Sequence, residues 1–126
     1  MRFRPEQHLR RQSDFRAVRE HGRRYNCGPF TLWCLRRDPA TASRPVAPAD
    51  LRRVGVVAST ASVGHAVLRN RAKRRLREIF RRHQESVPAG CDLLLTARAA
   101  MVDAPLPELE KKFVEACQRV APREKQ

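Results

Sequence analysis

The chain has 126 residues, with 27 Lys or Arg against 13 Asp or Glu, for a formal net charge of +14. This length suits one domain, and an apolar content of 41% is enough for one small core and argues against disorder. No apolar run approaches the roughly 20 residues of a membrane helix, and Met1–Arg11 lacks the apolar stretch of a signal peptide. We therefore expect one cytosolic domain over residues 1–126, with flexible tails at 1–8 and 121–126.

The first half of the chain predicts one helix and two strands. A helix is expected over Ser13–His21, with its first residue as the N-cap. Phe30–Leu35 is aromatic and apolar, which is typical of a strand. Residues 38–50 contain three prolines and predict a loop, and a second strand is expected at Arg53–Ala58.

The second half predicts two further helices and one strand. Ser59–Gly64 is small and polar, which indicates a turn, and a helix with one continuous apolar stripe follows at His65–His83. Asp92–Ala97 is nearly all apolar, as expected of a strand that is covered on both faces. The last helix is expected at Pro107–Val120. The order α-β-β-α-β-α predicts an α+β sandwich, with helices packed on a small sheet.

Cysteine and histidine show no metal-binding spacing. The four cysteines are far apart in sequence, without a C-x-x-C pair, and no histidine stands at a ligand offset from them. Cys34 lies in an apolar run and Cys117 on a helix face, so packing is the expected role of both. We expect neither a zinc site nor a disulfide among Cys27, Cys34, Cys91 and Cys117.

The positive charge is unevenly distributed. Residues before position 100 hold 22 basic and 8 acidic side chains, whereas the later residues are balanced. Only four of the 27 basic residues are Lys, and Arg makes bidentate contacts with phosphate that Lys makes less well. A small domain with this composition points to nucleic acid as its partner.

The helix expected at His65–His83 carries much of this charge, with Glu78 as its only acid. Solvated helix faces normally alternate Glu with Lys or Arg four residues apart, and that alternation is missing here. A bound polyanion explains the pattern better than a solvated surface, although charge alone does not separate DNA from RNA. Arg69 falls in the first turn, where backbone amides also favour phosphate.

The segment Ala66-Val-Leu-Arg-Asn-Arg-Ala-Lys-Arg-Arg-Leu-Arg-Glu78 resembles the Arg-Asn-Arg signature helix of the bacterial ribonuclease P protein family. The resemblance covers about residues 8–121. Other segments similar to that family are Ser13–Gly22 for its first helix, Phe30–Leu35, Arg53–Val57 and Asp92–Arg98 for its strands, and 105–120 for its terminal helix.

The resemblance implies a fold and a function. The fold is a two-layer sandwich similar to a ribosomal protein, with an uncommon left-handed β-α-β crossover. The function is that of a protein subunit that binds a catalytic RNA and the single-stranded 5′ leader of precursor tRNA. The RNA subunit then removes the leader, with Mg²⁺ acting through the RNA and with no cofactor and no catalytic residue on the protein.

The resemblance also implies two sets of site residues. The first set would bind the catalytic RNA and consists of Arg69, Asn70, Arg71, Lys73, Arg74 and Arg77. The second would line a cleft for the leader and consists of Phe15, Arg19, Trp33 and Arg53. Arg19 stands where the family often has a second aromatic residue, which shifts leader binding from stacking toward charge. For Phe15 and Trp33, packing in the core is as good an interpretation as stacking on a base.

Two functions fit the charge, the fold and the absence of a catalytic pattern. One is the ribonuclease P subunit, and the alternative is a structural RNA-binding protein of the ribosome or associated with it. Before residue 100 the acids are scattered singly, with no pair at a recognisable metal spacing, so hydrolysis by the protein alone is not expected. A DNA-binding helix-turn-helix is disfavoured because no short helix precedes the basic helix across a tight turn.

Overall fold

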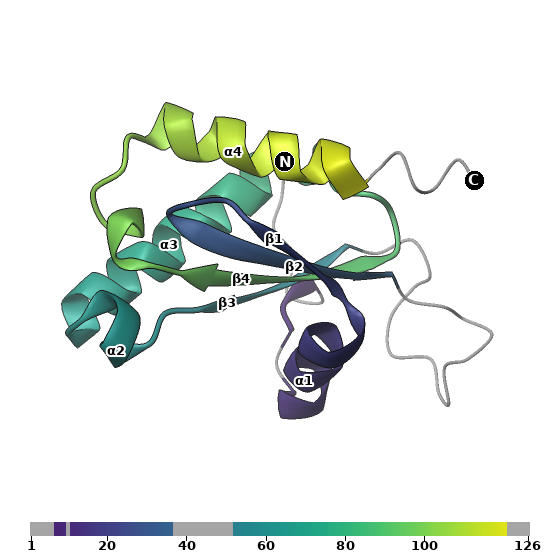
Figure 1. The fold of residues 1–126 in the computed structure, drawn as a ribbon, viewed down its shortest axis with the longest axis horizontal. Coiled ribbons are helices and arrows are strands. Elements are labelled where there is room, and N and C mark those ends of the chain that lie inside the picture. The colour runs from purple at the N-terminus through teal and green to yellow at the C-terminus, as the bar shows by residue number, and fades with distance from the viewer. Residues whose placement is uncertain (1–6, 10, 37–51, 121–126) are drawn as a thin grey trace.

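A mixed four-stranded sheet forms the centre of the computed structural model, which describes residues 7–9, 11–36 and 52–120 (Figure 1). The strands are β1 (Arg23–Asn26), β2 (Phe30–Arg36), β3 (Arg53–Val57) and β4 (Cys91–Ala97). They lie in the order β1-β2-β4-β3, with β3 and β4 parallel and the other two pairs antiparallel. The edges of the sheet are therefore β1 on one side and β3 on the other.

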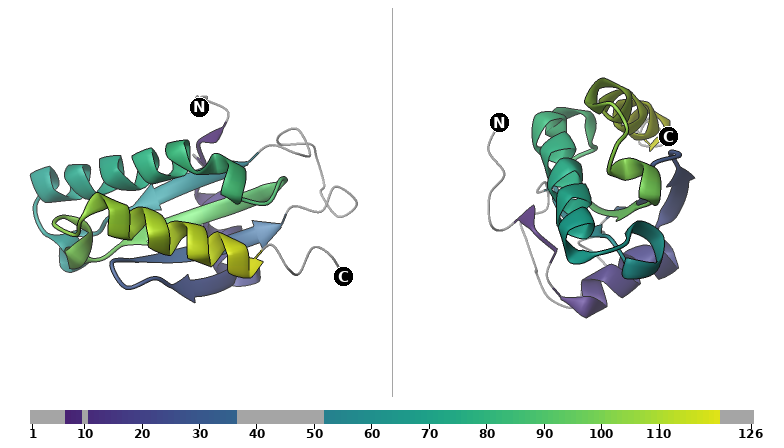
Figure 2. Two further views of the ribbon diagram at one scale, coloured as in Figure 1. Left: turned by 90° about the horizontal axis from the view of Figure 1, so that it is seen from above. Right: turned by 90° about the vertical axis from the view of Figure 1, so that its left-hand side faces the viewer.

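Helices cover both faces of this sheet. Figure 2 shows α1 on one face and α3 and α4 on the opposite face. The four helices are α1 (Gln12–His21), α2 (Thr60–Val63), α3 (Ala66–Arg82) and α4 (Leu106–Val120), with 3₁₀ turns at Gln84–Ser86 and Ala99–Met101. The predicted α+β class is confirmed, and α3 joins the parallel strands β3 and β4 as a crossover. The left-handed sense of that crossover stays a prediction.

The larger core lies between the sheet and the pair α3 and α4. The predicted apolar stripe of α3 is confirmed, since Leu76, Ile79 and Phe80 are fully buried. On α4 one apolar stripe is also buried, consisting of Leu109, Phe113, Ala116, Cys117 and Val120. Strand β4 is covered on both faces, as its apolar sequence predicts. Its Leu93 and Leu95 belong to this core, and Leu94 belongs to a second cluster on the other face.

The second cluster lies under α1, and an ion pair stabilises it. Val18 of α1 packs with Leu9 and Leu94, and several half-buried side chains surround them. Beside this cluster the buried guanidinium of Arg53 donates two hydrogen bonds to Asp92, at 2.9 and 2.7 Å. The same guanidinium lies 3.8 Å from Asp14 of α1. The ion pair therefore joins α1 to the two strands β3 and β4.

Two predictions about the N-terminal part are wrong. Ser13 does not cap α1: the helix begins at Gln12, and the amides of Asp14 and Phe15 donate to the backbone carbonyl of Arg11. Residue 7 is not part of a flexible tail, since Gln7 is 3% exposed and its amide donates to Arg52 O and Gln84 Oε1. The next residue, His8, pairs with Val54 of β3. The other predicted tail residues, 1–6 and 121–126, and the predicted loop 38–50 lie outside the described residues.

Two elements were not predicted from the sequence. Strand β1 has the sequence Arg-Arg-Tyr-Asn, which has no apolar alternation, and it forms because a hairpin pairs it with β2. Gly28 allows this hairpin, since its φ of 87° is a left-handed conformation that other residues rarely adopt. The segment expected as a turn before the basic helix contains the short helix α2.

The cysteines pack in the core as predicted for Cys34 and Cys117. All four are free thiols and buried. Burial raises the pKa of Cys27 to about 11 and that of Cys117 to about 12, so both remain protonated at neutral pH. In the described part of the chain, the helices are too short or too polar to cross a membrane.

Candidate nucleic-acid interface

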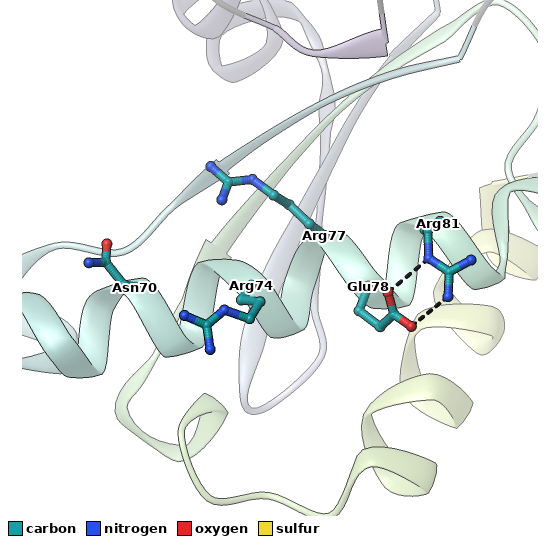
Figure 3. A pocket seen from close by; sticks show the side chains of 5 residues that line it. All are labelled: Asn70, Arg74, Arg77, Glu78 and Arg81. Atoms are coloured by element: carbon teal, nitrogen blue, oxygen red, sulfur yellow. Dashed lines mark hydrogen bonds and ion pairs between the residues drawn. The ribbon is translucent and has the colours of Figure 1, made fainter. Parts of the chain in front are cut away.

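The outward face of α3 forms a shallow pocket of about 370 Å³, which we call the α3 pocket (Figure 3). Its lining consists of Asn70, Arg74, Arg77, Glu78 and Arg81. Arg74 and Arg77 are exposed and have no ion pair within the residues that the structure describes. Figure 3 shows Arg77 extending away from the Glu78–Arg81 pair. The helix therefore presents uncompensated positive charge over its middle turns.

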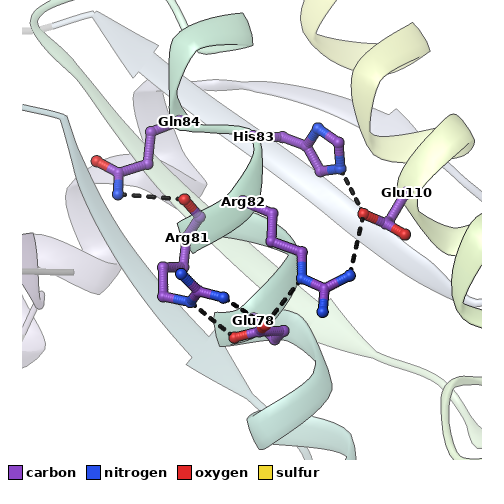
Figure 4. Close-up of polar contacts among 6 residues, drawn as sticks. All are labelled: Glu78, Arg81, Arg82, His83, Gln84 and Glu110. Atoms are coloured by element: carbon purple, nitrogen blue, oxygen red, sulfur yellow. Dashed lines mark hydrogen bonds and ion pairs between the residues drawn. The ribbon is translucent and has the colours of Figure 1, made fainter. Parts of the chain in front are cut away.

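The C-terminal end of α3 is different, because carboxylates neutralise it (Figure 4). Glu78 accepts hydrogen bonds from Arg81 at 2.8 and 2.6 Å and from Arg82 at 2.8 Å. Glu110 of α4 lies 2.7 Å from His83 and 3.8 Å from Arg82. The hydrogen bonds from Arg81 are the main reason why the pKa of Glu78 is lowered to about 2. The part of α3 whose basic side chains lack carboxylate partners therefore ends near Arg77.

Two arginines of α3 hold the chain that leads into α4. The Nε of Arg71 donates to the carbonyl of Val102 at 3.0 Å. Arg75 donates to the carbonyls of Met101 and Val102 at 3.0 and 2.7 Å, and also to that of Ala104. Because these carbonyls follow a 3₁₀ turn and lack helical partners, the two side chains act as caps for that segment. Arg71, predicted to bind RNA, thus has a structural contact as well.

The remaining predicted residues of this helix lie nearer its N-terminus. Asn70 is exposed, and Arg69 and Lys73 are half-buried. The Nε of Arg69 is buried and has no hydrogen-bond partner among the described residues. The side chain of Arg69 is therefore partly covered by the protein in the first turn of α3.

Two further pockets meet at Phe15 on the opposite side of the sheet. The first, the α1 pocket, measures about 590 Å³ and is lined by Gln12, Phe15, Arg16, Arg19, Glu20 and Val57. The second, the bridging pocket, measures about 210 Å³ and is lined by His8, Leu9, Phe15, Val54, Gly55, Val56 and Arg77. Arg77 lines both the bridging pocket and the α3 pocket. The basic face of α3 is thereby connected, around the β3 edge, to an aromatic ring on α1.

Gly55 is the reason why Phe15 can lie so close to the sheet. A Cβ atom at this position would stand 2.5 Å from Cε1 of the Phe15 ring, which is closer than two carbon atoms approach. The absence of a side chain therefore lets the ring lie directly on β3. Phe15 remains half-buried, with part of its surface open to both pockets.

The structure brings together only part of the predicted leader cleft. Phe15 and Arg19 line the same pocket. Trp33 belongs to the same apolar cluster as Phe15, but the guanidinium of Arg24 lies 5.8 Å from its ring centroid, and Trp33 lines neither pocket. Arg53 lines neither pocket, and its buried guanidinium is paired with two carboxylates, so its predicted place in the cleft gains no support from this geometry.

Sequence reasoning missed two cleft residues and the bridging position of Arg77. Arg16 and Gln12 precede Arg19 by one and two helical turns, so the 3.6-residue period could have found them. The place of Arg77 beside Phe15 depends on how the sheet edge is formed, which no local pattern indicates. Within the described residues, no three His, Cys, Asp or Glu side chains come together in a way that could hold a metal ion.

Comparisons with known proteins agree on one family. The family model described as Ribonuclease P matches residues 3–121. The ribonuclease P protein component of Desulfovibrio desulfuricans is 37% identical over 98 residues, covering 78% of this chain and 68% of that protein. The ribonuclease P protein component of Chloroflexus aurantiacus is 37% identical over 121 residues, which cover 90% of this chain and 80% of that protein. The solved RNase P protein of Thermotoga maritima has the same fold, with a TM-score of 0.71 at 24% identity, and covers 89% of this chain and 96% of that one.

The ion pairs of Glu78 predict a specific pH dependence. Its pKa lies below the usual 4.5, so the pairs stabilise the fold fully above that value and are lost as the pH falls through about 2. We expect the difference in unfolding free energy between wild type and Glu78→Gln to narrow as the pH falls from 4.5 to about 2. Urea denaturation at matched pH measures this difference. An NMR titration of the Glu78 carboxyl with a midpoint near 4.5 would contradict the assignment.

Proposed function

Because the chain belongs to the family of ribonuclease P proteins, we propose that it is the protein subunit of a ribonuclease P ribonucleoprotein. In this role it binds the catalytic RNA and the 5′ leader of precursor tRNA, and it assists removal of the leader. The observation that carries the proposal is the connection through Arg77 between the unpaired cations of α3 and the pocket around Phe15. A structural RNA-binding protein would need only the first of these surfaces.

The basic face of α3 is the proposed site for the catalytic RNA. Arg74 and Arg77 are exposed and without ion pairs in the described structure, so they can pair with phosphates and release counterions. Asn70 lies beside them in the α3 pocket and can donate or accept a hydrogen bond. Arg69, Arg71 and Lys73 complete the proposed surface at its N-terminal end.

The α1 pocket is the proposed site for the single-stranded leader. Single strands are bound by stacking of bases on aromatic rings beside a basic groove. Phe15 offers the ring, and Arg16 and Arg19 supply exposed positive charge along the same side of α1. Glu20 at the rim opposes this charge, so stacking carries part of the affinity.

We place the chemistry on the RNA subunit. The residues of the protein position two RNA molecules against each other, which lowers the entropic cost of bringing the scissile bond to the reacting groups. Mg²⁺ bound to the RNA would supply an activated water and stabilise the developing charge on phosphate. We also propose a cytoplasmic location for the complex, on the basis of family membership.

Reconstitution tests this function. Purified protein is mixed with a bacterial ribonuclease P RNA, and cleavage of precursor tRNA is followed. We expect the protein to raise kcat/KM for the leader-bearing substrate and to cleave nothing by itself. Tight RNA binding without any effect on cleavage would favour the structural alternative.

Arg74→Ala tests the α3 surface, and Arg81→Ala is its matched control on the same helix. Loss of a charge-assisted contact should weaken binding to the catalytic RNA by about 1–3 kcal/mol and reduce the slope of log affinity against log salt by about 1. Arg81 is already bonded to Glu78, so its loss should cost less. Filter binding over a salt series measures both effects. Equal losses for the two variants would show that the ion pair does not shield Arg81.

Phe15→Leu tests the α1 pocket, and Trp33→Leu is its control within the same apolar cluster. A stacked base is worth roughly 1–3 kcal/mol, so Phe15→Leu should weaken holoenzyme binding of leader-bearing tRNA and leave mature tRNA unaffected. Trp33→Leu should have a smaller effect, because Arg24 already lies over its ring. Urea denaturation checks that both variants fold. If Trp33→Leu instead loses more of the preference for leader-bearing over mature tRNA than Phe15→Leu does, the stacking site is Trp33.

A further inference from the structure

We propose that a fourth pocket, at the β1 edge of the sheet, binds the part of the single-stranded leader that extends beyond the α1 pocket. This β1-edge pocket measures about 400 Å³ and is lined by His21, Arg23, Tyr25, Cys34, Leu35, Arg36 and Val120. The inference rests on the proposed function, since it lengthens the path of the leader on the protein.

The lining of the pocket matches the chemistry of a nucleotide. Arg23 and Arg36 are exposed at the rim, and the described residues of the lining include no carboxylate. Glu20 lies 3.9 Å from His21, and both of these side chains are more than half exposed. Arg119 on α4 adds positive charge close enough to influence Tyr25. A phosphate at this rim would therefore meet cations from β1, β2 and α4.

The floor of the pocket is apolar and contains an aromatic ring. Tyr25 is half-buried, and its partner in the β1–β2 ladder is Leu32 of the larger core. Leu35, Cys34 and Val120 form the rest of the floor. Any base can stack on a tyrosine, so such binding does not depend on the RNA sequence, because every base has a π face. Burial raises the pKa of Tyr25, so its hydroxyl remains a hydrogen-bond donor.

The position of the pocket favours the leader over the catalytic RNA. The β1 edge is the edge of the sheet opposite to β3, beside which α3 and the bridging pocket lie (Figure 1). The α1 pocket extends along α1 as far as Glu20, and the next residue, His21, lines the β1-edge pocket. A strand that enters beside Arg77 and passes Phe15 along α1 would reach Arg23 by turning round the β1 edge, because Tyr25 and Cys34 of this pocket pack with the larger core. The three pockets together form one path from the catalytic-RNA surface to the far edge of the sheet.

Leader length provides the test. The reconstituted holoenzyme is assayed with precursor tRNAs whose leaders have about 5 or about 20 nucleotides, a range that spans typical single-strand site sizes. We expect wild type to bind the long leader more tightly, and Arg23→Gln to reduce the ratio of long-leader to short-leader affinity about 3- to 10-fold. Tyr25→Leu, which keeps apolar bulk, should reduce it likewise. Lys111→Gln removes a charge from the exposed side of α4 and should leave the ratio unchanged.

The outcomes separate this inference from the proposed function. An unchanged ratio in Arg23→Gln, with the effect of Phe15→Leu intact, would overturn the β1-edge site alone. Weaker binding of Arg23→Gln to the catalytic RNA without substrate would also overturn it, because the pocket would then hold that RNA. If Phe15→Leu too has no effect on any leader, the proposed function of the α1 pocket fails. Circular dichroism and urea denaturation confirm that each variant is folded.

Discussion

The ion pair between Arg53 and Asp92 fixes the position of α1, and the proposed leader path depends on that helix. Both side chains are buried, and a buried charge is costly unless its partner is in place. The guanidinium also lies near Asp14, so the pair attaches α1 to the sheet at one defined point. One residue further along α1, Phe15 lies against Gly55. A shift of the helix would therefore close or open both pockets that share this ring.

The arginines of α3 perform three tasks that the sequence does not distinguish. Arg71 and Arg75 satisfy carbonyl groups after the 3₁₀ turn at Ala99–Met101. Arg81 and Arg82 pair with Glu78, and Arg82 also lies near Glu110. The remaining positive charge of the middle turns has no such partner in the described structure. A helix that looks uniformly basic in sequence thus presents a narrow band of available charge, bounded on one side by ion pairs.

Local patterns were enough to predict most of the elements but little of the site geometry. The apolar periods of α3 and α4 and the continuous apolar run of β4 each depend on neighbouring residues, so they were readable from the sequence. Strand β1 could not be predicted from its sequence, since this polar segment becomes a strand only by pairing with β2. The resemblance implies a place for Arg53 in the cleft, and no local pattern reveals its pairing with Asp92, which is 39 residues away and meets it only through the parallel β3–β4 register. Glu110 of α4 and His83, the residue after α3, are also far apart in sequence and meet only in the folded chain.

The unpaired charge of α3 makes the free protein depend on its partner for stability. Like charges on adjacent helical turns repel each other, and that repulsion is relieved when phosphates take up positions between them. A ligand that binds the folded chain and not the unfolded one stabilises the fold by mass action. In the proposed function, RNA supplies the counterion that this helix lacks. If the helix binds RNA as proposed, copies of the protein made in excess of the RNA would populate the unfolded state more often and be degraded sooner.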